Sequence, residues 1–163
     1  MLLDRGPTPA LADQILYGIY GVEYGIYQVT EGSDQPGEQI LALDTSILLG
    51  LQWLPDGSGF LYSKTGDFSR NANLYEYHFA TGSVTPITHF TDEIAADFSI
   101  SPDGAQIIFA RAGDLESQLE LWVMDRDGSN MRLLVKNAAH PSWSWNMPQQ
   151  SPLMNTYLPV VSR

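Results

Sequence analysis

The chain of 163 residues contains no cysteine, which excludes disulfide bonds and metal sites built from thiolates. This absence fits a reducing cytoplasm as well as an exported protein without bridges. Basic residues are scarce, because only 8 Lys and Arg stand against 19 Asp and Glu, and the formal net charge is −11. Phosphate backbones and anionic membrane surfaces repel such a protein, so nucleic acid is not expected as a partner.

Long apolar runs are also missing. No stretch approaches the roughly 20 residues that span a bilayer, so membrane insertion is not expected. The first five residues, Met1 to Arg5, lack the basic and then apolar order of a signal peptide. Either export is not encoded here, or its signal belongs to a part of the gene that is not included.

Short strands and tight turns are what the composition favours. Hydrophobic residues make up 44% and charged residues 17%, which predicts one packed domain. Aromatic residues reach 11%, and 14 Gly and 10 Pro accompany them. Aromatic side chains are typical of strands, whereas Gly and Pro are typical of the turns between them. We therefore expect an all-β fold.

An internal repeat defines the architecture. The Pro-Asp-Gly sequence that begins at Pro55 recurs at Pro102, and Leu74 recurs as Leu121 with the same spacing of 47 positions. In each tight turn, Pro presets its own φ, Asp bonds back to the backbone and Gly accepts a positive φ. Each unit then reads as four strands within about 45 residues, which is the signature of a β-propeller blade.

The predicted strands of the two clear units fall at corresponding places. First strands end at Trp53 and Ile100. The other strands are expected at Phe60–Ser63, Leu74–His78 and Val84–Thr88 in one unit, and at Ile107–Ala110, Leu119–Asp125 and Met131–Val135 in the other.

Weaker copies of the repeat flank these units. Residues 15–20, 25–29 and 39–43 read as the second, third and fourth strands of an earlier blade whose first strand is missing. Residues 140–146 read as a further first strand. We thus expect an N-terminal segment (1–13), blades over 14–146 and a Pro-rich tail (147–163). The blades are placed at about 14–48, 49–92 and 93–138, plus the first strand at 140–146.

The run from Phe98 to Gly104, followed by Ile107 to Phe109 and by Leu121 to Gly128, resembles the WD40-like repeat of the TolB propeller family. The unit at 49–92 departs from this pattern because Leu54 stands where the family has Ser. The resemblance implies a six-bladed propeller and favours a periplasmic or extracellular location. Similar repeats occur in propellers attached to serine peptidases and in some lyases, so the resemblance identifies the fold better than the activity. The Gly-x-Ser-x-Gly motif of the peptidase domains is absent from this sequence.

Three blades are fewer than the four to eight that close a propeller ring. Either the chain is the C-terminal portion of a longer propeller, or two copies pair as three plus three blades. In the second case the strand at 140–146 of each copy completes the first blade of the other around a two-fold axis.

Several candidate sites have plainer interpretations. His78, His89 and His140 occupy unlike positions in the repeat, which argues against a shared metal. The segment from Asp125 to Asn130 resembles the start of a calcium loop, but Lys136 stands where the closing Glu belongs, so a hairpin turn is favoured.

Catalytic patterns are equally weak. Three serines lack a His and an acid at a meaningful spacing, which argues against nucleophilic catalysis: Ser99, Ser101 and Ser144. The acidic pairs Asp92 with Glu93 and Asp114 with Glu116 are interpreted as solvated loops. We accordingly predict no catalytic, cofactor-binding or metal-binding residue, and no cofactor.

Two further features bear on binding. The long loops 64–73 and 111–118 lie on one rim and are available to a partner. Trp122, Trp143 and Trp145 are the candidates for an aromatic binding patch, although core packing is the plainer role of each. The tail from 148 is either a disordered end or an edge segment docked through its apolar residues 156–161.

We expect a non-catalytic scaffold that binds a protein, peptide or other ligand at its rim or channel mouth. The alternative is a propeller lyase or hydrolase whose site lies in the channel of the assembled ring. An enzyme should gather ionisable groups with shifted pKa values around one concavity, whereas a scaffold should show an apolar or aromatic patch.

Overall fold

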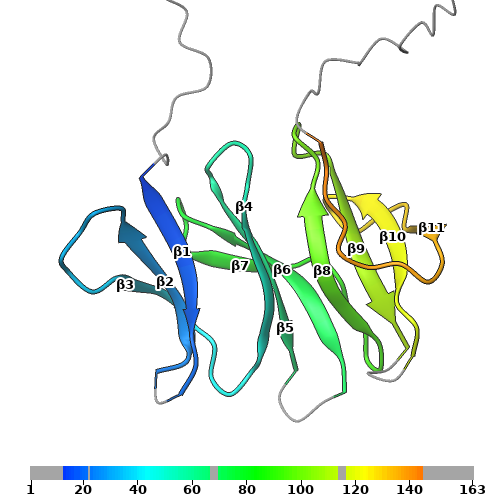
Figure 1. The fold of residues 1–163 in the computed structure, drawn as a ribbon, viewed down its shortest axis with the longest axis horizontal. Helices are drawn as coiled ribbons and strands as arrows, with labels where there is room; N and C mark the ends of the chain where they lie inside the picture. Colours follow the sequence, from blue (N-terminus) through cyan, green and yellow to red (C-terminus); the bar gives the residue numbers. More distant parts are fainter. Residues whose placement is uncertain (1–12, 22, 67–69, 114–116, 145–163) are drawn as a thin grey trace, which may run out of the picture.

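The computed structural model describes residues 13–21, 23–66, 70–113 and 117–144. The described residues form strands and turns without any helix, which confirms the expected all-β fold (Figure 1). No helix that could span a membrane is found among them. The strands are β1 (Gln14–Ile19), β2 (Gly25–Thr30), β3 (Glu38–Ala42), β4 (Leu48–Trp53), β5 (Gly59–Thr65), β6 (Ala72–His78), β7 (Ser83–Pro86), β8 (Ile94–Ile100), β9 (Gln106–Ala112), β10 (Glu120–Asp125) and β11 (Arg132–Val135).

The strands form three antiparallel units that stand side by side (Figure 1). We call β1–β3 the first blade, β4–β7 the middle blade and β8–β11 the last blade. Within the middle and last blades each strand pairs with the next one along the chain. A single parallel bridge between Ala72 and Ile94 connects these two blades through the backbone. The strands expected from the repeat are therefore present at corresponding positions.

The two Pro-Asp-Gly turns have the same construction. Asp56 Oδ1 accepts a hydrogen bond from the backbone N–H of Ser58 at 3.0 Å, and Asp103 Oδ1 accepts one from the N–H of Ala105 at 3.0 Å. The glycine that follows each aspartate has a φ of 72°. That conformation is costly for any residue with a Cβ atom, so the glycine is required for the turn.

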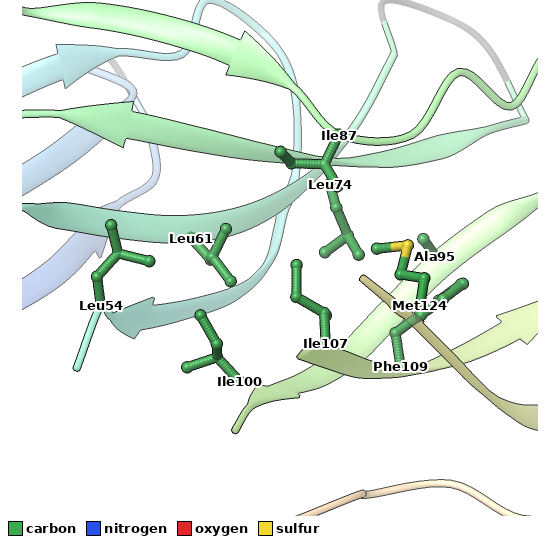
Figure 2. Close-up of a cluster of buried hydrophobic side chains, with 9 residues drawn as sticks. All are labelled: Leu54, Leu61, Leu74, Ile87, Ala95, Ile100, Ile107, Phe109 and Met124. Atoms are coloured by element: carbon green, nitrogen blue, oxygen red, sulfur yellow. The ribbon is translucent and has the colours of Figure 1, made fainter. Parts of the chain in front are cut away.

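Apolar side chains pack between the blades rather than within one sheet. Middle-blade residues Leu61 and Leu74 meet last-blade residues Ile107 and Phe109 in a buried cluster of nine side chains (Figure 2). A second cluster joins the first and middle blades and contains Ile26, Phe60, Tyr62 and Tyr77. β5 and β6 of the middle blade therefore direct alternate side chains toward opposite neighbouring blades.

The inner strands are also connected by a repeated hydrogen bond. In the middle blade, Gln52 Oε1 accepts from the backbone N–H of Ile100 at 3.2 Å. Ser99, at the same place in the repeat, accepts through Oγ from the N–H of Trp143 at 3.3 Å. Trp143 therefore occupies, relative to the last blade, the position that Ile100 of β8 occupies relative to the middle blade.

A second bond supports this equivalence. The N–H of Ala138 donates to the carbonyl of Leu119 at 3.0 Å, beside the start of β10. Ala72, which corresponds to Leu119, makes the parallel bridge to Ile94 at the start of β8. The segment 138–143 thus follows the course of an inner strand. Residues 140–144 form no strand ladder, and 145–146 lie outside the described residues, so a strand at 140–146 remains a prediction.

Candidate binding site at the loop rim

Arg111, near the end of β9, is held rigidly at one rim of the last blade. Its guanidinium nitrogens donate to both carboxylate oxygens of Glu93, with the two shortest bonds at 2.6 and 2.8 Å. The same group lies over the rings of Phe90 and Trp122, 4.8 and 4.4 Å from their centroids. Ion pairing and cation–π contact together fix this side chain and the indole beside it.

The repeat contains a simpler version of this arrangement. Lys64 stands in the middle blade where Arg111 stands in the last, and its Nζ donates to Ser46 Oγ at 3.1 Å. It also lies 5.7 Å from the centroid of the Tyr75 ring, which corresponds to Trp122. A cation over an aromatic side chain is thus a structural device of the blade. This correspondence is the sequence signal by which Arg111 could have been found.

A small cavity opens next to Arg111. Its volume is about 190 Å³, and it is lined by Glu93, Arg111, Ala112, Gly113, Gln118, Glu120 and Trp122. Trp122 Nε1 donates to Glu120 Oε2 at 3.2 Å, so the indole and the carboxylate are positioned together. A second hollow of about 320 Å³ shares Gln118 and extends over Leu119, Asn137, Ala138 and Ala139.

Glu120 differs in its surroundings from its counterpart in the middle blade. That counterpart, Asn73, is buried and accepts hydrogen bonds from the Thr88 hydroxyl and the N–H of Phe90 at 2.8 and 2.7 Å. Glu120 is half-exposed and faces the cavity. The last blade therefore presents a carboxylate, an amide and an indole where the middle blade has a closed polar network. We call Gln118, Glu120 and Trp122 the rim site.

The three histidines occupy separate places. His78 Nε2 lies 3.2 Å from Glu76 Oε1, whereas His140 Nδ1 lies 3.0 Å from Asp97 Oδ2 on the inner side of the last blade. His89 lies in the connection between β7 and β8. Within the described ranges, no group of three or more His, Cys, Asp or Glu side chains could hold a metal ion.

The segment from Asp125 to Asn130 forms the hairpin between β10 and β11. Asp127 Oδ1 accepts from the N–H and the hydroxyl of Ser129 at 2.9 and 2.6 Å, and these bonds lower the pKa of Asp127. Asn130 donates to Asp125 Oδ2 at 2.6 Å. Asp127 is thus occupied by donors of the hairpin itself, and Asp125 by Asn130 of the hairpin and by Gln106 of β9.

The candidate nucleophiles have structural contacts. Ser101 Oγ donates to Asp103 Oδ1 at 2.6 Å and accepts from the N–H of Gln106, and Ser99 Oγ accepts from Trp143. Ser144 is exposed.

The described acidic residues have different contacts. Glu93 pairs with Arg111, while Asp92 accepts from the Thr91 hydroxyl at 3.3 Å. Asp114 and Glu116 lie outside the described residues.

The tryptophans considered for an aromatic patch are not brought together. Trp122 packs against the apolar cluster between the middle and last blades. Trp143 is half-buried at the inner side, where its Nε1 donates to the carbonyl of Ser99 at 3.1 Å. Trp145 and the apolar tail at 156–161 lie outside the described residues.

One buried ion pair was not foreseen. Arg126 donates to the two carboxylate oxygens of Glu76 at 2.6 and 2.8 Å, although Glu76 is only 4% exposed. The two residues belong to neighbouring blades. Glu76 occupies a strand position that points into the interface between blades, where the pattern predicts an apolar side chain.

Comparison with known proteins agrees with this architecture. No family model matches the chain. It is 32% identical over 118 residues to a protein named "Tol-Pal system protein TolB" of Anaeromyxobacter dehalogenans, a match that covers 71% of this chain and 26% of that protein. The chain therefore spans about a quarter of the length of the curated relatives it matches.

Solved structures show the same fold. TolB from Acinetobacter baumannii aligns with a TM-score of 0.65 at 22% identity, over 80% of this chain and 31% of that one. TolB from Agrobacterium tumefaciens has a TM-score of 0.59 at 23% identity, over 75% and 41% of the two chains. An oligogalacturonate lyase in complex with manganese aligns with a TM-score of 0.62 at 14% identity, over 78% and 34%. With its repeat, its blades and its curated relatives in agreement, this chain belongs to the TolB-like β-propeller family.

Proposed function

We propose that the chain is a non-catalytic scaffold that binds a protein partner at the rim site of the last blade. One observation carries this proposal: Glu120 and Trp122 are positioned together beside a cavity, where the middle blade has a closed polar network. A fixed indole next to exposed polar groups is typical of protein-binding surfaces, because it offers contact area with little loss of side-chain freedom.

Charge indicates the chemistry of the partner surface. The net charge of the chain is −11, and the guanidinium of Arg111 is already paired with Glu93. The rim site therefore offers the carboxylate of Glu120 and the amide of Gln118. A complementary surface would present Lys, Arg or amide groups around an apolar centre. The name shared by the curated relatives, which refers to a protein system, supports a protein as the partner.

Site-specific photo-crosslinking tests the proposal. A photoreactive amino acid replaces Gln118 in the purified chain, and the matched control carries it at Asp34, an exposed residue of the first blade. In an extract of its own cells we expect a discrete protein adduct from position 118 and none from position 34. Excess unlabelled wild-type chain should compete for that adduct, whereas the Glu120→Arg chain should not. Equal adducts at both positions, or equal competition by both chains, would contradict the proposal.

An enzyme remains the second candidate function, because of one pair of residues. Asp97 holds His140 through Nδ1 at 3.0 Å on the inner side of the last blade, an arrangement that can orient an imidazole for proton transfer. The likeness to a lyase concerns the fold. A substrate-dependent activity toward acidic oligosaccharides that the His140→Gln and Asp97→Asn variants both lose would favour the enzyme over the scaffold. Activity unaffected by both variants would remove this pair from consideration.

The second part of the proposal concerns assembly. A ring needs more than three blades, which either further blades of a longer protein or a second copy of this chain would supply. Such a homodimer would be a six-bladed ring with two copies of the rim site.

A further inference from the structure

The cavity at the rim site lies where the last blade faces the middle blade. Glu120 pairs directly with Arg111 across β10 and β9. Trp122, two residues further along β10, packs against the apolar cluster between these two blades. Alternate residues of a strand share a face, so the rim site belongs to the face that the last blade turns toward the middle blade. Two described blades therefore set its surroundings.

Charge at this rim differs between the two units of the repeat. Three positions carry the difference, and in the middle and last blades they are occupied by Ser46 and Glu93, Lys64 and Arg111, and Asn73 and Glu120. The middle blade thus has one ammonium among neutral side chains, whereas the last blade has one guanidinium and two carboxylates. One carboxylate of the last blade is left without a cation.

That carboxylate belongs to Glu120. Both oxygens of Glu93 accept hydrogen bonds from Arg111. Glu120 forms no ion pair with any of the described residues. Its Oε2 accepts from the indole N–H of Trp122 at 3.2 Å, so Oε1 is the oxygen left for another donor. A half-buried carboxylate of this kind favours a ligand that brings a positive charge.

The size and lining of the cavity restrict that ligand further. Its volume of about 190 Å³ is below the roughly 300–1,000 Å³ of pockets for drug-sized molecules. One side chain of a partner fits this size better than a nucleotide or a sugar chain. The lining combines Ala112 and the indole of Trp122 with the carboxylate of Glu120 and the amide of Gln118. An apolar stem with a cationic head matches such a lining.

Lysine meets these conditions better than arginine. A guanidinium binds a carboxylate best through two parallel bonds, and Glu120 already gives one oxygen to the indole. A guanidinium also stacks on aromatic faces, but that of Arg111 already lies 4.4 Å from the ring centroid of Trp122. An ammonium is compact and directs its three donors to separate acceptors. Lys64 shows this mode in the middle blade, where its Nζ combines a hydroxyl acceptor with the ring of Tyr75.

From these contacts we infer that the rim site binds one lysine side chain of the partner. The ammonium lies at Glu120 and Gln118, and the alkyl stem lies along Trp122. The inference rests on the proposed function, because it takes the partner to be a protein. It adds a means of regulation, since acetylation of that lysine removes the charge and would release the partner.

Titration of the purified full chain with blocked tripeptides tests the site by itself. The probe has a central lysine between two glycines, and its analogues carry acetyl-lysine, norleucine or arginine instead. The nuclear magnetic resonance signal of the Trp122 indole N–H reports binding, because this group contacts Glu120. We expect the lysine peptide to bind at least about tenfold more tightly than the acetyl-lysine and norleucine peptides, which lack the charge-assisted hydrogen bond. The arginine peptide should bind more weakly than the lysine peptide.

A charge-removing variant locates the binding. Glu120→Gln keeps an oxygen that can accept from the indole of Trp122, and it should weaken the lysine peptide at least about tenfold. The matched control is Glu31→Gln, which removes the same charge from an exposed residue of the first blade and should leave the affinity unchanged. No binding of the lysine peptide, equal binding of the norleucine peptide, tighter binding of the arginine peptide or equal losses in the two variants would overturn the inference.

The inference and the proposed function fail separately. Absence of the adduct at position 118 contradicts the protein scaffold and does not alter the tripeptide titration. Where the adduct forms, treatment of the extract with an acetylating reagent for lysine should abolish it, whereas phenylglyoxal, which modifies arginine, should not. An adduct that survives acetylation would overturn the assignment to lysine and leave the scaffold intact.

Discussion

Arg126, in the hairpin of the last blade, donates two hydrogen bonds to the carboxylate of Glu76, which lies buried in the middle blade. The two residues are 50 positions apart in the chain and belong to different blades. The contact ties the blades together at a point where their backbones share no ladder, since the single bridge lies at Ala72 and Ile94.

Removing one member of this pair should be costly. Arg126→Met removes both guanidinium hydrogen bonds from the buried carboxylate of Glu76 and leaves it the contact with His78, and we expect a loss of about 3 kcal/mol in the free energy of unfolding, measured by urea denaturation. The double variant Glu76→Val/Arg126→Met, which introduces the valine found at the equivalent position 123, should regain most of that loss. Equal stability of the single and double variants would show that the buried charge is not the cause.

Two glycines with positive φ should respond differently to alanine. Gly104 has a φ of 72°, and an added Cβ would meet nothing closer than 3.5 Å, so Gly104→Ala should cost about 1–2 kcal/mol of backbone strain. Gly128 has a φ of 86°, and its Cβ would lie 2.3 Å from the carbonyl oxygen of Ile87 in the middle blade. Gly128→Ala should therefore destabilise the chain more, as thermal unfolding of both variants would reveal. The reverse order would contradict this packing.

Acid should weaken the aspartate turns. The hydroxyl of Ser101 and the N–H of Ala105 hold the pKa of Asp103 below its ordinary value of 3.8. A lowered pKa in the folded state means that the stabilisation is present above the unfolded value and is lost as the pH falls through the folded value. We expect wild-type stability to decline below about pH 4, with a shallower decline for Asp103→Asn. Parallel acid titrations of the two chains would exclude a contribution from this turn.

Leucines at equivalent positions of the repeat should contribute different amounts to the free energy of unfolding. Leu74 is fully buried between two blades, so Leu74→Ala should lower the free energy of unfolding by about 3 kcal/mol. Leu121, at the same place in the repeat, is half-exposed in the isolated chain, and Leu121→Ala should cost about 1 kcal/mol in dilute protein. Urea denaturation at increasing protein concentration should raise the second value if a further blade covers Leu121. A cost for Leu121→Ala equal to that for Leu74→Ala in dilute protein would refute the difference in burial.

The fold could be predicted from the repeat, because the residues of each tight turn determine the conformation of that turn. Pro55 and Pro102 introduce turns whose aspartates and glycines behave alike, and strand alternation then sets the two faces of every blade. The hairpin at Asp127 was likewise identified from its turn residues.

Side-chain contacts between sheets were less accessible to prediction. Nothing near Glu76 in the sequence indicates that Arg126 will reach it, since that contact depends on the relative placement of two blades. The environment of Glu120 differs for another reason: its counterpart Asn73 is closed in by Thr88 and Phe90 of its own unit, whereas the last unit has Val135 and Asn137 at those positions. Whether the same repeat position is buried or accessible therefore depends on other residues of its unit, which differ between units.

The single backbone bridge at Ala72 and Ile94 has an evolutionary consequence. Because the middle and last blades adhere mainly through side chains, duplication or deletion of a 47-residue unit would insert or remove a whole module and break only this one backbone bridge. Such genes can therefore vary in blade number while each module retains its own hydrogen bonding.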